Sequence, residues 1–160
     1  MAKNQLSEFF REKQAKAKPA DADWLAKRDA WISAVERLYD TIEKTYLAET
    51  KSAVKVDRSR RKEITEPYIG AYSISEMALA VGEELVVFSP KGVNLVGAAG
   101  RVDVRGDRGE AMIVRQPGDR WSLVVSRTPS LRLVPITGDN ASPVKGGDEA
   151  LLDLLRSVMR

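Results

Sequence analysis

The hydrophobic pattern of this chain changes its period near residue 52, and this change constrains the fold more than any other feature. From Asp21 to about Glu49, apolar residues recur at helical spacing without an internal glycine or proline. Beyond residue 52, apolar and polar residues alternate, as they do in half-buried strands. The sequence therefore predicts an α+β fold in which a long amphipathic N-terminal helix precedes a β domain.

The long helix carries a wide apolar stripe. Trp24, Trp31 and Leu38 recur every seven residues, and Val35 and Ile42 complete the 3–4 spacing. At 1.5 Å per residue the helix is about 40 Å long, which exceeds the diameter of a compact domain of this size. We therefore expect a second subunit to cover part of the stripe, which places these five residues at a homodimer interface. In the alternative interpretation, the helix lies along its own sheet.

A shorter helix is predicted over residues 4–17. Leu6, Phe9 and Phe10 form an apolar spot on it, and Pro19 ends it. If the long helix lies on its own sheet, this short helix is expected to fold back on the free end of the long one.

The β domain reads as an antiparallel meander of six to eight strands, because turn signals recur about every ten residues. Pro117 and Gly118 occupy the two central places of a type II turn. A tight hairpin at residues 106–109 would place Arg105 beside Glu110 as a cross-strand ion pair. Residues 75–82 are assigned to a strand, although their composition also suits a helix. Apolar residues on both faces indicate a curved or sandwich-like sheet.

The chain is expected to end in a short helix capped by Asp148 that packs on the sheet. The predicted organisation is a helical region (1–50), an antiparallel β domain (51–137) and a polar loop with the last helix (138–160), folding as one cooperative unit. The apolar face expected of the last helix consists of Leu151, Leu152, Leu155, Val158 and Met159.

The chain contains no cysteine and no histidine. This excludes zinc fingers, iron–sulfur clusters, disulfides, cysteine nucleophiles and histidine-based triads. No catalytic constellation or cofactor motif is found, so we expect a non-enzymatic protein without cofactors. The alternative enzyme is a carboxylate–metal one at the 103–110 hairpin, where Asp103, Asp107 and Glu110 cluster. Arginines interleave with these acids and would neutralise them.

The glycines at positions 92, 97 and 100 suggest a phosphate-binding loop. Such a loop requires a helix after it, and a strand pattern follows here. We therefore interpret residues 97–100 as a sharp bend of the sheet, where a functional groove is an alternative.

Residues 51–62 form the most basic segment, with six basic residues against one acidic residue. Its side chains could contact phosphates, which makes nucleic-acid binding the second functional hypothesis. The segment has no aromatic residue for base stacking, and no nucleic-acid-binding motif accompanies it. The alternative is a solvated segment that balances the acidic helix before it. The candidate contacts are Lys51, Lys55, Arg58, Arg60, Arg61 and Lys62.

No apolar run approaches the roughly 18–20 residues that span a bilayer, and residues 1–10 lack the pattern of a secretory signal. We therefore expect a cytoplasmic protein without membrane contact. The leading functional hypothesis is a protein-interaction module, homodimeric through its long helix, with an unidentified protein partner.

Overall fold

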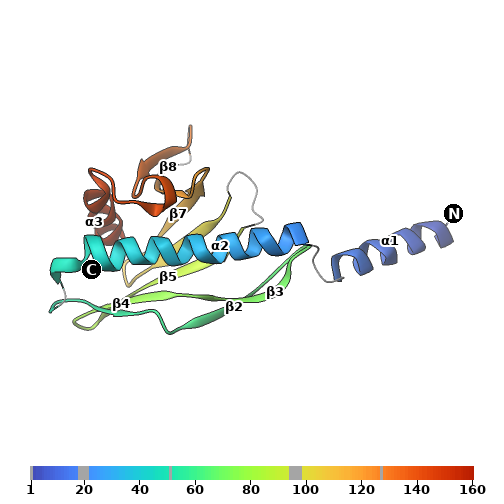
Figure 1. Ribbon diagram of the computed structural model, residues 1–160, viewed down its shortest axis with the longest axis horizontal. Helices are drawn as coiled ribbons and strands as arrows, with labels where there is room; N and C mark the ends of the chain where they lie inside the picture. The colour runs from blue at the N-terminus through green and yellow to red at the C-terminus, as the bar shows by residue number, and fades with distance from the viewer. Residues whose placement is uncertain (1, 18–21, 51, 94–98, 127) are drawn as a thin grey trace.

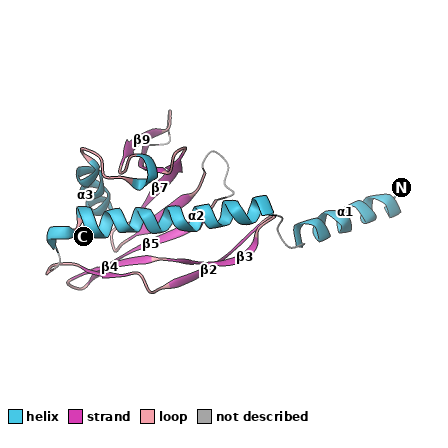
Figure 2. Ribbon diagram, in the orientation of Figure 1, coloured by secondary structure: helices cyan, strands magenta, loops and turns pink. Residues whose placement is uncertain are grey.

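A long helix lies across an antiparallel sheet in the computed structural model, and strands curve past it on two sides (Figure 1). The structure describes residues 2–17, 22–50, 52–93, 99–126 and 128–160. Within them it has three α-helices, a seven-stranded antiparallel sheet and a two-stranded ribbon (Figure 2). The predicted α+β class with an antiparallel meander is confirmed.

The helical elements are α1 (Ala2–Ala17), α2 (Ala22–Asp40), the π-helix η1 (Thr41–Tyr46), the 3₁₀ turns η2 (Ala48–Thr50) and η3 (Asp139–Ala141), and α3 (Gly147–Val158). The strands are β1 (Lys55–Asp57), β2 (Arg61–Glu66), β3 (Gly70–Ser75), β4 (Met77–Val81), β5 (Glu84–Gly92), β6 (Arg101–Arg105), β7 (Glu110–Gln116), β8 (Arg120–Ser126) and β9 (Arg132–Pro135).

The main sheet is a meander from β4 to β9, with β1 added beside β4, while β2 and β3 pair separately. The expected hairpin places Arg105 opposite Glu110, and their side chains form an ion pair at 3.1 Å. Residues 77–81 are a strand, as predicted. The described strands number nine, one more than the upper expectation, because residues 55–75 form three short strands.

The long helix is not uniform. Helical structure continues to Thr50, but the α-helix ends at Asp40 and a π-helix follows. The Thr41 hydroxyl donates to the carbonyl of Ala141, and the Tyr46 hydroxyl donates to the carbonyl of Ile136. The change from α-helix to π-helix therefore coincides with contacts to the C-terminal segment. A local sequence pattern does not predict such contacts, because the partners lie far apart in the chain.

The core lies between α2 and the concave face of the sheet. The fully buried residues include Trp31 of α2 and Trp121 of β8, whose ring centroids are 5.9 Å apart. The sheet contributes Val86, Phe88 and Val104 among others. These residues come from four elements, so the core joins α2 to three strands of the main sheet.

The last helix packs as predicted but on a slightly rotated face. Leu152 is exposed, whereas Ala150 and Leu154 are buried. The sequence pattern is compatible with burial of either set of residues. The contacts of α3 with β7 and β9 determine which set is buried.

The helix α1 extends away from the rest of the molecule (Figure 1). It does not fold back on α2, so that expectation is wrong for this structure. None of the helices in the described ranges is long and apolar enough to cross a membrane.

Candidate functional site

Four of the five residues proposed for a dimer seam, which lie on α2 and at the start of η1, are inside the protomer. Trp31, Val35, Leu38 and Ile42 have no exposed surface, and only Trp24 is partly exposed. The protomer's own sheet covers this stripe, as in the alternative interpretation. A second subunit is therefore not needed to cover these four side chains.

The basic segment is divided by the fold, and Arg58 is held by three carboxylates. Its guanidinium lies 2.6 Å from Glu36, 2.7 Å from Asp40 and 3.1 Å from Glu43. It also lies over the Tyr39 ring at 5.6 Å. Burial would raise the pKa of Asp40, but hydrogen bonds and attraction from Arg58 outweigh it, so this pKa is lowered from its usual range. Arg58 therefore ties the segment before β2 to α2 and η1.

Replacing Arg58 by methionine is expected to lower the free energy of unfolding by about 1–2 kcal/mol, since three carboxylates lose a shared cation. A lowered carboxyl pKa stabilises the fold above the unfolded pKa and stops doing so as pH falls through the folded pKa. The deficit should therefore be constant from about pH 5 to 8 and shrink below about pH 4. Urea denaturation across this range measures it, with Arg60→Met as the exposed control. A deficit that grows on acidification would contradict the assignment.

The other basic residues of the segment have different surroundings. The Lys62 ammonium donates to the Ser89 hydroxyl and to the Pro90 carbonyl, each at 2.9 Å. Burial and the neighbouring Lys91 lower the pKa of Lys62. Arg61 is exposed and donates to serine hydroxyls of β3, while Lys55 and Arg60 are exposed. Lys51 lies outside the described residues.

The carboxylates of the 103–110 hairpin are each paired with an arginine. Asp103 accepts from Arg101 at 3.1 Å, and Asp107 lies 3.1 Å from Arg160. Glu110 forms the cross-strand pair already described. Among the described residues, no three acidic side chains come together as a metal site. Each of these carboxylates therefore has an arginine as its partner, instead of the neighbouring carboxylates that a metal site requires.

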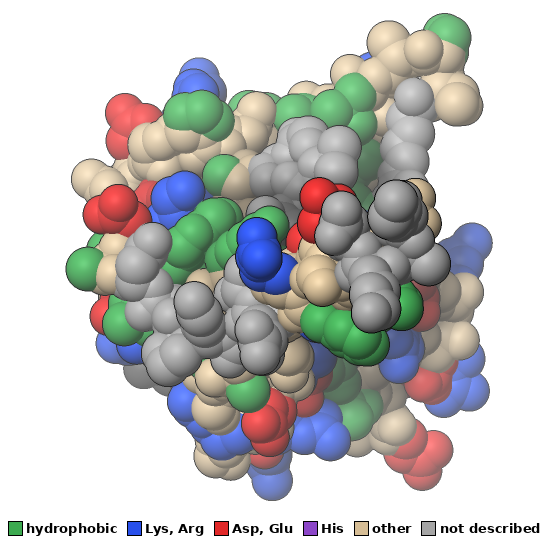
Figure 3. All heavy atoms as spheres, turned by 90° about the vertical axis from the view of Figure 1, so that its right-hand side faces the viewer, with side chains coloured by type: hydrophobic (Ala, Val, Ile, Leu, Met, Phe, Trp, Pro, Cys, Tyr) green, Lys and Arg blue, Asp and Glu red, His purple; other side chains and the backbone are tan. Residues whose placement is uncertain are grey.

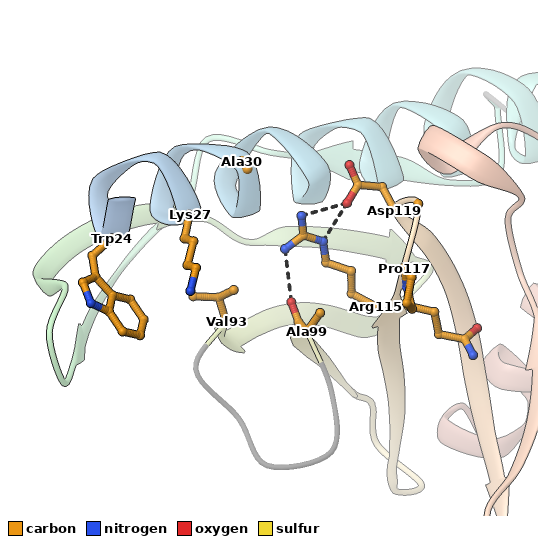
Figure 4. Close-up of a pocket in the computed structure, with 10 residues that line it drawn as sticks. Trp24, Lys27, Ala30, Val93, Ala99, Arg115, Pro117 and Asp119 are labelled. Atoms are coloured by element: carbon orange, nitrogen blue, oxygen red, sulfur yellow. Dashed lines mark hydrogen bonds and ion pairs between the residues drawn. The ribbon is translucent and has the colours of Figure 1, made fainter. Parts of the chain in front are cut away.

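A cleft of about 380 Å³ lies where the first turns of α2 meet the β7–β8 turn and the end of β5 (Figure 4). It opens on the end of the molecule from which α1 extends. Figure 3 views this end, where hydrophobic side chains lie exposed among basic and acidic ones. The cleft is lined by Trp24, Lys27, Ala30, Val93, Ala99, Arg115, Gln116, Pro117, Gly118 and Asp119.

Arg115 and Asp119 build one wall of the cleft. The Asp119 carboxylate lies 2.7 Å from Arg115 and 2.6 Å from Arg37 of α2. Arg115 also donates to the Ala99 carbonyl at 3.1 Å, and its guanidinium lies over the Trp31 ring. The guanidinium therefore joins β7, α2 and the segment before β6, and it shares the Asp119 carboxylate with Arg37.

The opposite wall is aromatic and carries the other cation. Trp24 stacks on Tyr68 of the β2–β3 turn with centroids 5.4 Å apart. The ammonium of Lys27 lies 4.4 Å from the centroid of the Trp24 ring. Lys27 is exposed, and no carboxylate in the described part of the chain is within ion-pair distance of it. The cleft therefore presents Lys27 as an exposed cation without a carboxylate partner among the described residues, beside apolar surface.

Buried polar contacts fix the floor of the cleft at Val93. Its backbone N–H donates to the carboxylate of Glu66 at 3.0 Å, and the Tyr72 hydroxyl donates to the other oxygen of Glu66. Burial and this hydrogen bond raise the pKa of Tyr72. The Glu66 side chain therefore anchors the end of β5 without entering the cleft.

The sequence interpretation missed Lys27, Arg115 and Asp119. The Pro117–Gly118 turn was expected, but its contact with α2 joins residues that are 82 positions apart. Of the bend predicted at residues 97–100, Ala99 lines the cleft and Gly100 packs against Trp31, while residues 97 and 98 lie outside the described ranges.

The lining of the cleft offers apolar surface and a cation, and its lining residues include no hydroxyl or thiol nucleophile. This chemistry suits binding of an apolar group next to a negative charge. Comparison of the chain with protein-family models, with curated proteins and with solved structures gives no match.

Proposed function

We propose that this protein is a non-enzymatic protein-interaction module that forms homodimers, with α1 as the contacting element. One observation carries the proposal. Leu6, Phe9 and Phe10 lie on one face of α1 and are 55%, 52% and 59% exposed. Their i, i+3, i+4 spacing is that of a helix that binds in an apolar groove.

Energetics favour a partner for α1. A 16-residue helix is marginally stable in isolation. Fully burying an exposed large apolar side chain contributes about 1.5–3 kcal/mol, and these side chains are about half exposed, so two α1 faces in a symmetric pair contribute about 5–9 kcal/mol. Association costs about 4–15 kcal/mol. A pair that buries both faces is therefore favoured over a contact that buries one.

Phe9→Glu/Phe10→Glu is expected to convert a dimer into a monomer. Glutamate retains helix propensity, so the variant removes apolar surface without breaking α1. Light scattering after size exclusion, over a hundredfold range of protein concentration, measures the mass. Val125→Glu/Leu131→Glu is the control, because both side chains are similarly exposed but lie far from α1 in the chain. A monomeric unmutated protein at every concentration would refute the proposal.

Nucleic-acid binding by residues 51–62 is the second candidate. The exposed side chains of Lys55, Arg60 and Arg61 support it. With about three phosphate contacts, the logarithm of the affinity should fall with the logarithm of salt concentration at a slope of about −3. The engagement of Arg58 and Lys62 within the fold makes this the weaker candidate.

A further inference from the structure

We propose that the cleft beside Trp24 and Lys27 is the receptor for α1 of a second copy of this chain, so that two protomers exchange their first helices. This rests on the proposed function and adds where α1 binds. Each protomer then supplies one helix and one cleft, which gives a closed two-fold assembly.

The two surfaces are chemically complementary. The apolar face of α1 ends in two aromatic rings, Phe9 and Phe10, packed edge to face at 5.7 Å. The cleft offers Trp24, Val93, Ala99 and Pro117 as apolar lining, and its volume of about 380 Å³ has room for aromatic side chains. An aromatic side chain entering a hollow of this kind is a typical interface anchor.

Charged side chains of both signs flank the Phe9 ring on α1, where the Lys13 ammonium lies 5.5 Å from the ring centroid. Glu8 and Glu12 lie four residues apart on α1, beside Phe9, and both are exposed. The cleft lining has two cations and one carboxylate, and Arg115 is held by this carboxylate, which Asp119 shares between Arg115 and Arg37. Lys27 thus remains as the cation for an incoming carboxylate. With Phe9 seated in the cleft, Glu8 or Glu12 of the same helix is placed to pair with it.

The direction of α1 favours a second copy over the protomer's own cleft. The helix extends outward beyond the N-terminal end of α2 (Figure 1), whose first turns line the cleft. Phe10 and Leu6 lie seven and eleven positions before Ala17, so the apolar face spans about 10 to 17 Å from the end of α1 nearest the domain. The apolar face of α1 therefore lies away from the cleft of its own protomer, where the cleft of a second protomer can receive it.

The absence of cysteine from the natural sequence makes cross-linking a direct test. A Glu12→Cys chain is mixed with a Lys27→Cys chain and treated with a short bis-maleimide. We expect a covalent heterodimer, identified by giving the two chains different masses. Lys145→Cys replaces Lys27→Cys as the control, because Lys145 is exposed and lines a different hollow, beside Tyr46 and Thr50 at the other end of the long helix. No heterodimer above this control would overturn the inference.

Charge reversal gives a second measurement. Lys27→Glu and Glu8→Lys/Glu12→Lys are each expected to raise the dimer dissociation constant about tenfold, and the combined variant should return to within about threefold of the unmutated protein. Lys145→Glu should leave it unchanged. No effect of either reversal would overturn the inference.

The outcomes separate the two proposals. A dimer that Phe9→Glu/Phe10→Glu dissociates, but that gives no cross-link to the cleft, keeps α1 as the contact and rejects the cleft as its receptor. A monomer in which Glu12→Cys/Lys27→Cys cross-links within one chain rejects both the exchange and the homodimer, and shows that α1 covers its own cleft.

Discussion

Trp121→Ala is expected to lower the free energy of unfolding by about 3–5 kcal/mol. The Trp121 ring has no exposed surface and packs against the ring of Trp31. Truncation removes the burial of a large side chain and leaves a cavity that two rigid strands and α2 cannot collapse to fill. Since small domains are stable by about 5–15 kcal/mol, the variant loses a large part of its stability.

Urea denaturation followed by far-ultraviolet circular dichroism measures this loss. Trp24→Ala is the matched control, because Trp24 is only partly buried and stacks on an exposed tyrosine. We expect the control to lose less than about 2 kcal/mol. A loss below about 1 kcal/mol for Trp121→Ala would show that its ring does not belong to the core.

Gly100→Ala is expected to cost about 2–5 kcal/mol, although it adds one methyl group. A Cβ atom at this position would lie 2.2 Å from Cζ3 of Trp31, a ring that is fully buried. The backbone φ of +144° is also unfavourable for a residue with a side chain. The expected cost combines overpacking of about 1–3 kcal/mol with backbone strain of about 1–2 kcal/mol.

Gly82→Ala separates the two contributions. Gly82 also has a positive φ, of +59°, but nothing lies within 4 Å of its added Cβ. Its replacement should therefore cost only the backbone strain, about 1–2 kcal/mol. Equal losses for the two variants, measured by thermal and urea denaturation, would contradict the close contact between Gly100 and Trp31.

Trp121 and Gly100 both bear on the candidate cleft, because both contact Trp31, whose ring supports the cleft wall. The guanidinium of Arg115 lies 5.9 Å from the centroid of the Trp31 ring, and Arg115 itself lines the cleft. A displaced Trp31 ring would therefore disturb Arg115 and its pairing with Asp119. Stability of the core and shape of the cleft are coupled through this one side chain.

The sequence alone determined the features that depend on neighbours in the chain. The change of hydrophobic period gave the helical start and the strands after it, because each period reflects the geometry of one element. The Arg105–Glu110 pair was predictable since a tight hairpin fixes the register of the strands beside it. The strand predicted at residues 75–82, found at 77–81, was less determined by local pattern, because its composition also suits a helix.

The tertiary structure decided which surface covers each apolar face and which charges meet. Periodicity indicates that Leu38 and Ile42 are buried, but a sheet of the same chain and a helix of a partner would satisfy the same pattern. Arg58 lies 15–22 residues from the carboxylates that hold it, and Arg37 lies 82 residues from Asp119. The cleft depends on such contacts, because it forms only where α2, β5 and the β7–β8 turn converge, and no local pattern encodes that convergence.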